Sequence, residues 1–105
     1  MIVQSELRLS AQRAFLGRIH AEMRLVKIKS AGREIILTVV LGTAPSAQVR
    51  EDVSLAAAEI IADFPNADRI EEHLTVTDAP LMREDIRAEG WIYQRSEPTK
   101  DSRTT

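Results

Sequence analysis

The segment DFPNADRIEEH, residues 63–73, holds four acids and a histidine within eleven positions. Carboxylate oxygens and imidazole nitrogens are metal ligands and proton-transfer groups, so this segment is the first candidate for a metal site or an acid–base pair. Its spacing matches neither an EF-hand loop nor an H-E-x-x-H helix. If residues 70–76 form a strand, Glu72 and His73 point to opposite faces of the sheet. The pattern therefore predicts no metal site and favours a corner between a helix and a strand.

No other segment shows the residue pattern of an enzyme site. The chain has no cysteine, its serines lie in no G-x-S-x-G elbow, and its four glycines form neither a P-loop nor a dinucleotide fingerprint. We therefore expect no catalytic residue and no cofactor, and a function that is not enzymatic. A small enzyme, or a domain that binds nucleic acid or a ligand, is the alternative.

The charges differ sharply between the two halves of the chain. Residues 1–50 hold eight Lys or Arg against three acids, whereas residues 51–105 hold six against thirteen. Such asymmetry is typical either of charge pairing within one fold or of binding to a partner of opposite charge. Nucleic acid is a disfavoured partner, because the pI of about 5.7 is far below the basic range of dedicated binders. Neutralisation within the fold is the simpler interpretation.

Length and composition indicate a single globular domain. A chain of 105 residues with 44% apolar and 29% charged side chains can bury one core, and residues 98–105 resemble a flexible C-terminal tail. The domain therefore spans residues 1–97. The longest apolar run, residues 35–41, is too short to cross a bilayer, and the first ten residues lack a secretory signal. These features predict a cytoplasmic protein without a membrane partner, and they leave the oligomeric state open.

Hydrophobic periodicity predicts the elements that position the acidic segment. Apolar residues at helical spacing indicate a helix over about 6–19, with Ser10 as a candidate cap, and a stronger one over 46–64 that Pro65 stops. Alternating residues indicate strands over 24–29, 33–41, 69–76 and 90–96. The connection 77–90 is long enough for a short helical turn around 83–88.

This order of helix, strand, strand, helix, strand, strand predicts an α+β fold. We expect both helices to pack on one face of a four-stranded, mainly antiparallel sheet, with residues 33–41, apolar on both faces, near its centre. Residues 24–29 and 33–41 should form a hairpin. Trp91 and Tyr93 share one face of the last strand, where they either pack in the core or anchor a partner.

Four segments resemble a family of short uncharacterised bacterial proteins. The segments are AFLGRIHAEMRLV (14–26), EIIADFP (59–65), IEE (70–72) and GWIYQRSE (90–97). The family pattern begins A-L-L-G-R-I…L-R-x-V, has a helix ending D-F-P, and closes with G-x-W-V-Y-x-R-x-E. This chain departs from the pattern at residues 20–22 and in the longer loop 79–89.

Some members of that family are identified as immunity proteins of bacterial toxin systems. The resemblance implies a non-catalytic protein that binds a toxin domain and covers its working surface. Complementary charge speeds such association, and a nuclease-like toxin is basic where it grips phosphate. On this hypothesis the partner-binding residues are Asp63, Asp68, Glu71, Glu72, Trp91 and Tyr93.

Overall fold

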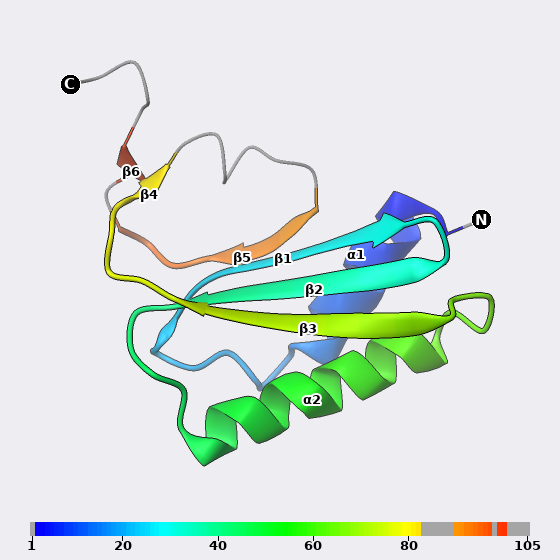
Figure 1. The fold of residues 1–105 in the computed structure, drawn as a ribbon, viewed down its shortest axis with the longest axis horizontal. Coiled ribbons are helices and arrows are strands. Elements are labelled where there is room, and N and C mark those ends of the chain that lie inside the picture. The colour runs from blue at the N-terminus through cyan, green and yellow to red at the C-terminus, as the bar shows by residue number, and fades with distance from the viewer. Residues whose placement is uncertain (1, 83–89, 98, 101–105) are drawn as a thin grey trace.

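The computed structural model describes residues 2–82, 90–97 and 99–100. Within these residues, two helices and six strands follow in the order α1 (Gln4–Ala14), β1 (Met23–Ala31), β2 (Glu34–Leu41), α2 (Ala47–Ala62), β3 (Arg69–Val76), β4 (Leu81–Met82), β5 (Trp91–Gln94) and β6 (Thr99–Lys100) (Figure 1). The predicted helical turn around 83–88 lies outside the described residues.

Four strands form one sheet in the order β3-β2-β1-β5. β1 is antiparallel to both β2 and β5, whereas β2 and β3 are parallel. The parallel pair follows from α2, which carries the chain from the end of β2 back to the start of β3, as a crossover connection must. The α+β class and the β1–β2 hairpin are confirmed, and the sheet is mixed rather than purely antiparallel.

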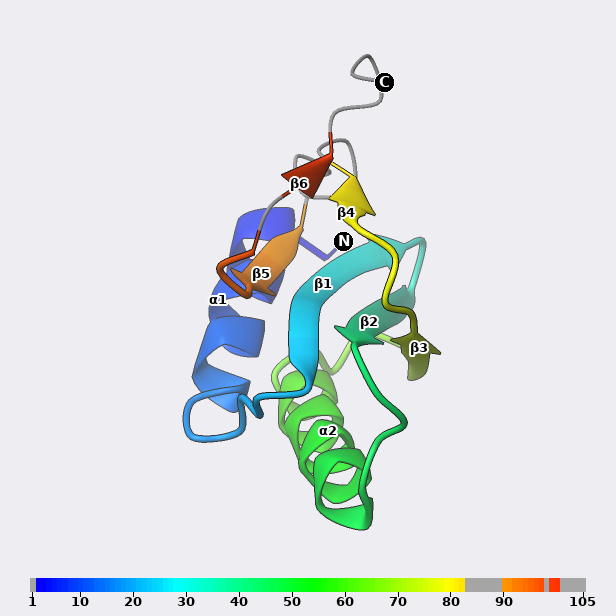
Figure 2. The same ribbon diagram turned by 90° about the vertical axis from the view of Figure 1, so that its left-hand side faces the viewer.

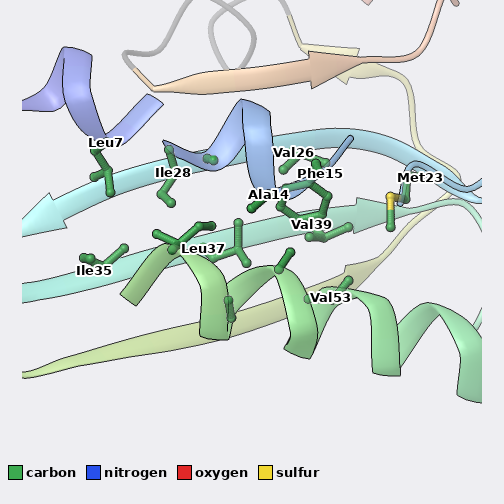
Figure 3. Close-up of a cluster of buried hydrophobic side chains, with 14 of the residues drawn as sticks. Leu7, Ala14, Phe15, Met23, Val26, Ile28, Ile35, Leu37, Val39 and Val53 are labelled. Atoms are coloured by element: carbon green, nitrogen blue, oxygen red, sulfur yellow. The ribbon is translucent and has the colours of Figure 1, made fainter. Parts of the chain in front are cut away.

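Both helices cover the same face of this sheet, and they pack against each other (Figure 2). The core lies between the two layers, where alternate residues of β2 meet the apolar stripe of α2 (Figure 3). Ile35, Leu37 and Val39 are fully buried, while the residues between them are half-buried. This pattern confirms that β2 runs through the centre of the sheet.

Helix α2 begins and ends where its sequence predicts. The hydroxyl oxygen of Ser46 accepts a hydrogen bond from the backbone N–H of Val49 at 3.2 Å, the usual contact of an N-cap serine. At the other end Asp63 is the C-cap residue, directly before Phe64 and Pro65. The DFP sequence is therefore the end of this helix.

Helix α1 differs from its prediction, because it ends at Ala14 rather than near residue 19. Gly17 has a φ of 78°, a left-handed conformation that interrupts a helix and suits glycine. The side chain of Arg18 donates to the carbonyl oxygen of Ala14 at 2.8 Å and so satisfies one of the last helical acceptors. Gly17 and Arg18 together explain the early end.

The proposed cap at Ser10 is also wrong. Ser10 lies inside α1 with 2% of its surface exposed, and the helix starts six residues earlier. Its hydroxyl donates to Asp63 Oδ2 at 2.6 Å, which joins the two helices.

Two short strands lie apart from the main sheet. β4 and β6 pair in parallel, so the predicted 77–90 connection contains a strand that its polar sequence did not indicate. Most of the predicted tail lies outside the described residues, and the 1–97 domain boundary stays a prediction. None of the helices described is long and apolar enough to cross a membrane.

Candidate functional site

The four acids predicted to bind a partner lie around the connection from α2 to β3, and we call this group the acidic corner (Asp63, Asp68, Glu71, Glu72). Asp63 accepts the Ser10 hydrogen bond and lies 3.6 Å from Arg13. Asp68 pairs with Arg33 at 3.1 Å, with both side chains more than half exposed. These two carboxylates are therefore paired within the chain, at the surface.

The last two acids of the corner lie on opposite faces of β3. Glu71 is on the face that the helices leave open, where it contacts Arg69 and lies 3.1 Å from His73. Glu72 is on the helix side, where it accepts a hydrogen bond from Ser54 at 2.9 Å. Within the described parts of the chain, no three metal-ligating side chains gather in one place.

Trp91 and Tyr93 lie far from the acidic corner. They belong to β5, and the strand order puts β5 and β3 at opposite edges of the sheet, roughly 14 Å apart from three strand spacings. Tyr93 packs against the core, whereas Trp91 is 40% exposed and lies under the guanidinium of Arg8 at 5.6 Å. The structure does not bring the six predicted residues into one patch.

The opposite charges of the two halves pair across the fold. Among the described residues, four arginines of the first half form ion pairs with acids of the second half: Arg13–Asp63, Arg18–Glu59, Arg24–Glu97 and Arg33–Asp68. The prediction that the fold neutralises much of its own charge asymmetry is thereby confirmed.

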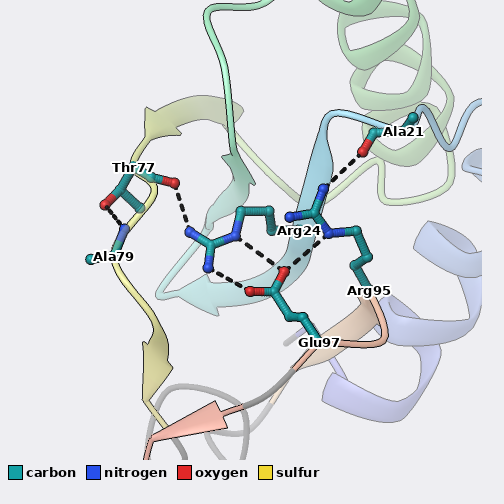
Figure 4. Close-up of polar contacts among 6 residues, drawn as sticks. All are labelled: Ala21, Arg24, Thr77, Ala79, Arg95 and Glu97. Carbon is teal, nitrogen blue, oxygen red and sulfur yellow. Dashed lines mark hydrogen bonds and ion pairs between the residues drawn. The ribbon is translucent and has the colours of Figure 1, made fainter.

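One ionic cluster was not predicted as a site (Figure 4). Its ion pair Arg24–Glu97 is the most buried one among the described residues. Arg24, at the start of β1, is 3% exposed and binds Glu97 through two hydrogen bonds, Nη2–Oε1 at 2.5 Å and Nε–Oε2 at 3.2 Å. A third donor of Arg24 reaches the carbonyl oxygen of Thr77 at 2.6 Å. The bidentate geometry is the strong form of an Arg–carboxylate pair.

Arg95 completes this cluster from the segment after β5. Its Nε donates to Glu97 Oε2 at 3.0 Å, and its Nη1 donates to the carbonyl oxygen of Ala21 at 3.1 Å. We call Arg24, Arg95 and Glu97 the arginine–glutamate cluster. It connects the start of β1, the end of β3 and the segment that follows β5.

The electrostatics of the cluster favour the charged forms of Arg24 and Glu97. The hydrogen bonds from Arg24, followed by the one from Arg95, lower the pKa of Glu97 despite its burial. Glu97 in turn raises the pKa of Arg24. A carboxylic acid with a lowered pKa is a poor proton donor near neutral pH. The cluster is therefore better suited to binding a partner, or to holding the three segments together, than to acid catalysis.

An open pocket of about 430 Å³ lies against this cluster. Its lining comes from the ends of several strands: Ala21, Glu22, Arg24, Gly42, Thr43, Asp78, Arg95 and Glu97. β2, β3 and β5 run in the same direction, and their carboxyl ends meet here. In sheets with parallel strands, that end is where ligands commonly bind.

The sequence carried a weak signal for the cluster. Arg24 interrupts an apolar strand between Met23 and Leu25, and it lies inside the AFLGRIHAEMRLV segment that supports the family resemblance. Arg95 and Glu97 lie inside the other terminal segment, GWIYQRSE. The two segments meet in space although Arg24 and Glu97 are 73 positions apart.

Comparison with known proteins gives one finding about family. No curated protein matches the chain. A protein-family model does match it, over residues 4–97, and that model describes the MafI2 immunity protein.

Proposed function

Because the chain belongs to the MafI2 immunity protein family, we propose that it protects against a toxin by binding that toxin and covering a surface it needs. Membership of an immunity-protein family indicates a non-enzymatic function. The match carries this proposal, because it spans every element from α1 to β5. Binding of this kind is stoichiometric, with one immunity protein for each toxin domain blocked.

The acidic corner is the part of the protein's own surface whose charge is complementary to a basic toxin. β3 is an edge strand of eight residues, so its outer side is free of sheet partners among the described residues. Acids of the acidic corner are held by surface pairs such as Arg33–Asp68, which contribute only about 0–1 kcal/mol each. A basic partner can therefore replace these weak pairs with its own at small cost. Trp91 would belong to a separate contact at the opposite edge.

A binding experiment with the cognate toxin domain tests the proposal. Titration calorimetry should show one-to-one binding, and stopped-flow mixing should show slower association for Glu71→Lys/Glu72→Lys, because electrostatic steering is lost. We expect a decrease in the association rate of about tenfold at low salt and a smaller salt dependence.

The matched control is Glu6→Lys/Glu51→Lys, which makes the same change in net charge at exposed helix positions. It should associate at close to the wild-type rate. If the wild-type protein and the toxin do not bind at micromolar concentrations, the proposed function is wrong. If binding occurs and the two double variants behave alike, the acidic corner is not the contact surface.

A further inference from the structure

The arginine–glutamate cluster forms the floor of the pocket beside it, and hydrogen bonds fix the side chains of this floor. Glu97 accepts three hydrogen bonds from Arg24 and Arg95, and both arginines also donate to backbone carbonyl oxygens. These bonds hold long side chains in one conformation before any partner arrives. Preorganisation of this kind lowers the entropy cost of binding.

The rim of the pocket carries the negative charge. The lining includes two guanidinium groups and three carboxylates, one negative charge in excess. Glu97 balances one of the arginines at the floor, whereas Glu22 and Asp78 form no ion pair with a described residue. Asp78 is exposed and Glu22 is half-buried, so both carboxylates are accessible to a partner.

The pocket is open on one side and is wide enough to admit a long side chain of a partner. Its volume of about 430 Å³ lies at the lower end of the range for ligand sites, roughly 300–1,000 Å³. Interfaces are commonly anchored by one long side chain, often Arg, that fills such a pocket. The excess negative charge of the lining, from Glu22 and Asp78, favours a cationic side chain, Lys or Arg, over an anionic one.

We propose that this pocket receives a lysine or arginine side chain of the toxin, as the anchor of the complex. The inference rests on the proposed function and assigns it a second contact region, at the carboxyl ends of β2, β3 and β5. The acidic corner steers the partner toward the protein, and the pocket holds it.

Gly42 lines the pocket, so a larger side chain at this position would close it. A Cβ at Gly42 would lie 3.6 Å from Arg24 Cδ and 3.9 Å from Arg95 Nη2, both ordinary contact distances, and the backbone there has no positive φ. Gly42→Leu therefore fills the pocket from its wall. We expect toxin binding to weaken by about tenfold or more, mainly through faster dissociation.

The control for this variant is Ala31→Leu, at the exposed opposite end of the sheet. It should bind like the wild type. Circular dichroism and the melting temperature of Gly42→Leu must match those of the wild type, which separates a filled pocket from a misfolded chain.

Removing the negative charges of Glu22 and Asp78 tests whether the toxin side chain in the pocket is a cation. Glu22→Gln/Asp78→Asn should weaken binding by about tenfold, whereas Glu6→Gln/Glu51→Gln, with the same change in net charge, should bind like the wild type. If the toxin binds Gly42→Leu and the rim variant as tightly as the wild type, the inference is wrong while the proposed function stands. If the rim variant alone is unaffected, the anchor is not a cation and the inference is again overturned. Failure of the wild type to bind the toxin overturns both.

Discussion

At the scale of single residues, Arg24 and Glu97 form the most buried ion pair among the described residues. Arg24 is almost fully buried, and Glu97 balances its charge. Removing Arg24 takes away two of the three hydrogen bonds to Glu97, leaving the one from Arg95, and it also removes the donor to the Thr77 carbonyl oxygen. We therefore expect Arg24→Ala to lower the free energy of unfolding by about 3 kcal/mol. Urea denaturation followed by circular dichroism measures this change.

The exposed pair Arg33–Asp68 supplies the control for Arg24. Arg33→Ala should change the unfolding free energy by less than about 1 kcal/mol, because solvent screens that pair. Replacing both buried partners, as Arg24→Met/Glu97→Leu, should cost less than Arg24→Ala alone. Equal effects of Arg24→Ala and Arg33→Ala would contradict a structural role for the buried cluster.

His20 and Asp52 give the protein a pH-dependent contact between the α1–β1 connection and α2. Their side chains lie 2.6 Å apart, and the hydrogen bond with His20 lowers the pKa of Asp52. A lowered carboxyl pKa stabilises the fold above the unfolded value of about 3.9 and stops doing so as the pH falls through the folded value. Asp52→Asn should therefore be less stable than the wild type at pH 5–7.

That difference should begin to narrow as the pH falls below about 4, since the carboxyl of the unfolded chain then takes up a proton, and it should narrow further as the pH falls through the lower pKa of the folded Asp52 carboxyl. Urea denaturation of both proteins between pH 7 and pH 3 measures it. A gap that stays constant over this range would show that the Asp52 charge does not contribute to stability.

At the scale of elements, the attachment of β5 to β1 depends on Gly90. Gly90 has a φ of 97°, and its carbonyl oxygen accepts a hydrogen bond from the Ile28 N–H at 2.8 Å. A Cβ at this position would lie 2.0 Å from the Ile28 carbonyl oxygen, so the strand would have to move. We expect Gly90→Ala to lower the unfolding free energy by about 2 kcal/mol or more, from strain and loss of pairing.

Gly17→Ala is the matched comparison for Gly90→Ala. Gly17 also has a positive φ, but a Cβ there would have nothing within 4 Å. Its replacement should cost only the backbone strain, about 1 kcal/mol. Thermal denaturation compares the two variants, and a cost at Gly17 equal to that at Gly90 would contradict the steric account.

At the scale of the whole molecule, one core joins both helices to the main sheet, so the protein should unfold in a single step. Trp91 is the single tryptophan and reports on β5, whereas far-ultraviolet circular dichroism reports mainly on the helices. The two signals should give the same urea midpoint. An earlier fluorescence transition would mean that β5 detaches before the rest unfolds.

Local patterns in the sequence predict several elements of the fold correctly. Alternation from Ile35 to Leu41 predicts a central strand, the stripe from Val49 to Ile60 predicts α2, and β3 has its predicted bounds. These features depend on neighbours a few positions apart, which the sequence shows directly. The end of α1 is harder to predict from the sequence, because it depends on a positive φ at Gly17 and a side-chain cap from Arg18.

Contacts between distant residues were decided only by the tertiary structure. The sequence alone predicted two helices, the four strands of the main sheet and a corner of acids, and it carried the family resemblance. It did not predict that β3 pairs in parallel with β2, that Trp91 lies at the far edge from Glu71, or that Arg24 meets Glu97. Periodicity is a property of each segment, whereas strand order and register result from how all segments share one core. The acidic corner could therefore be predicted, and the pocket beside Arg24 could not.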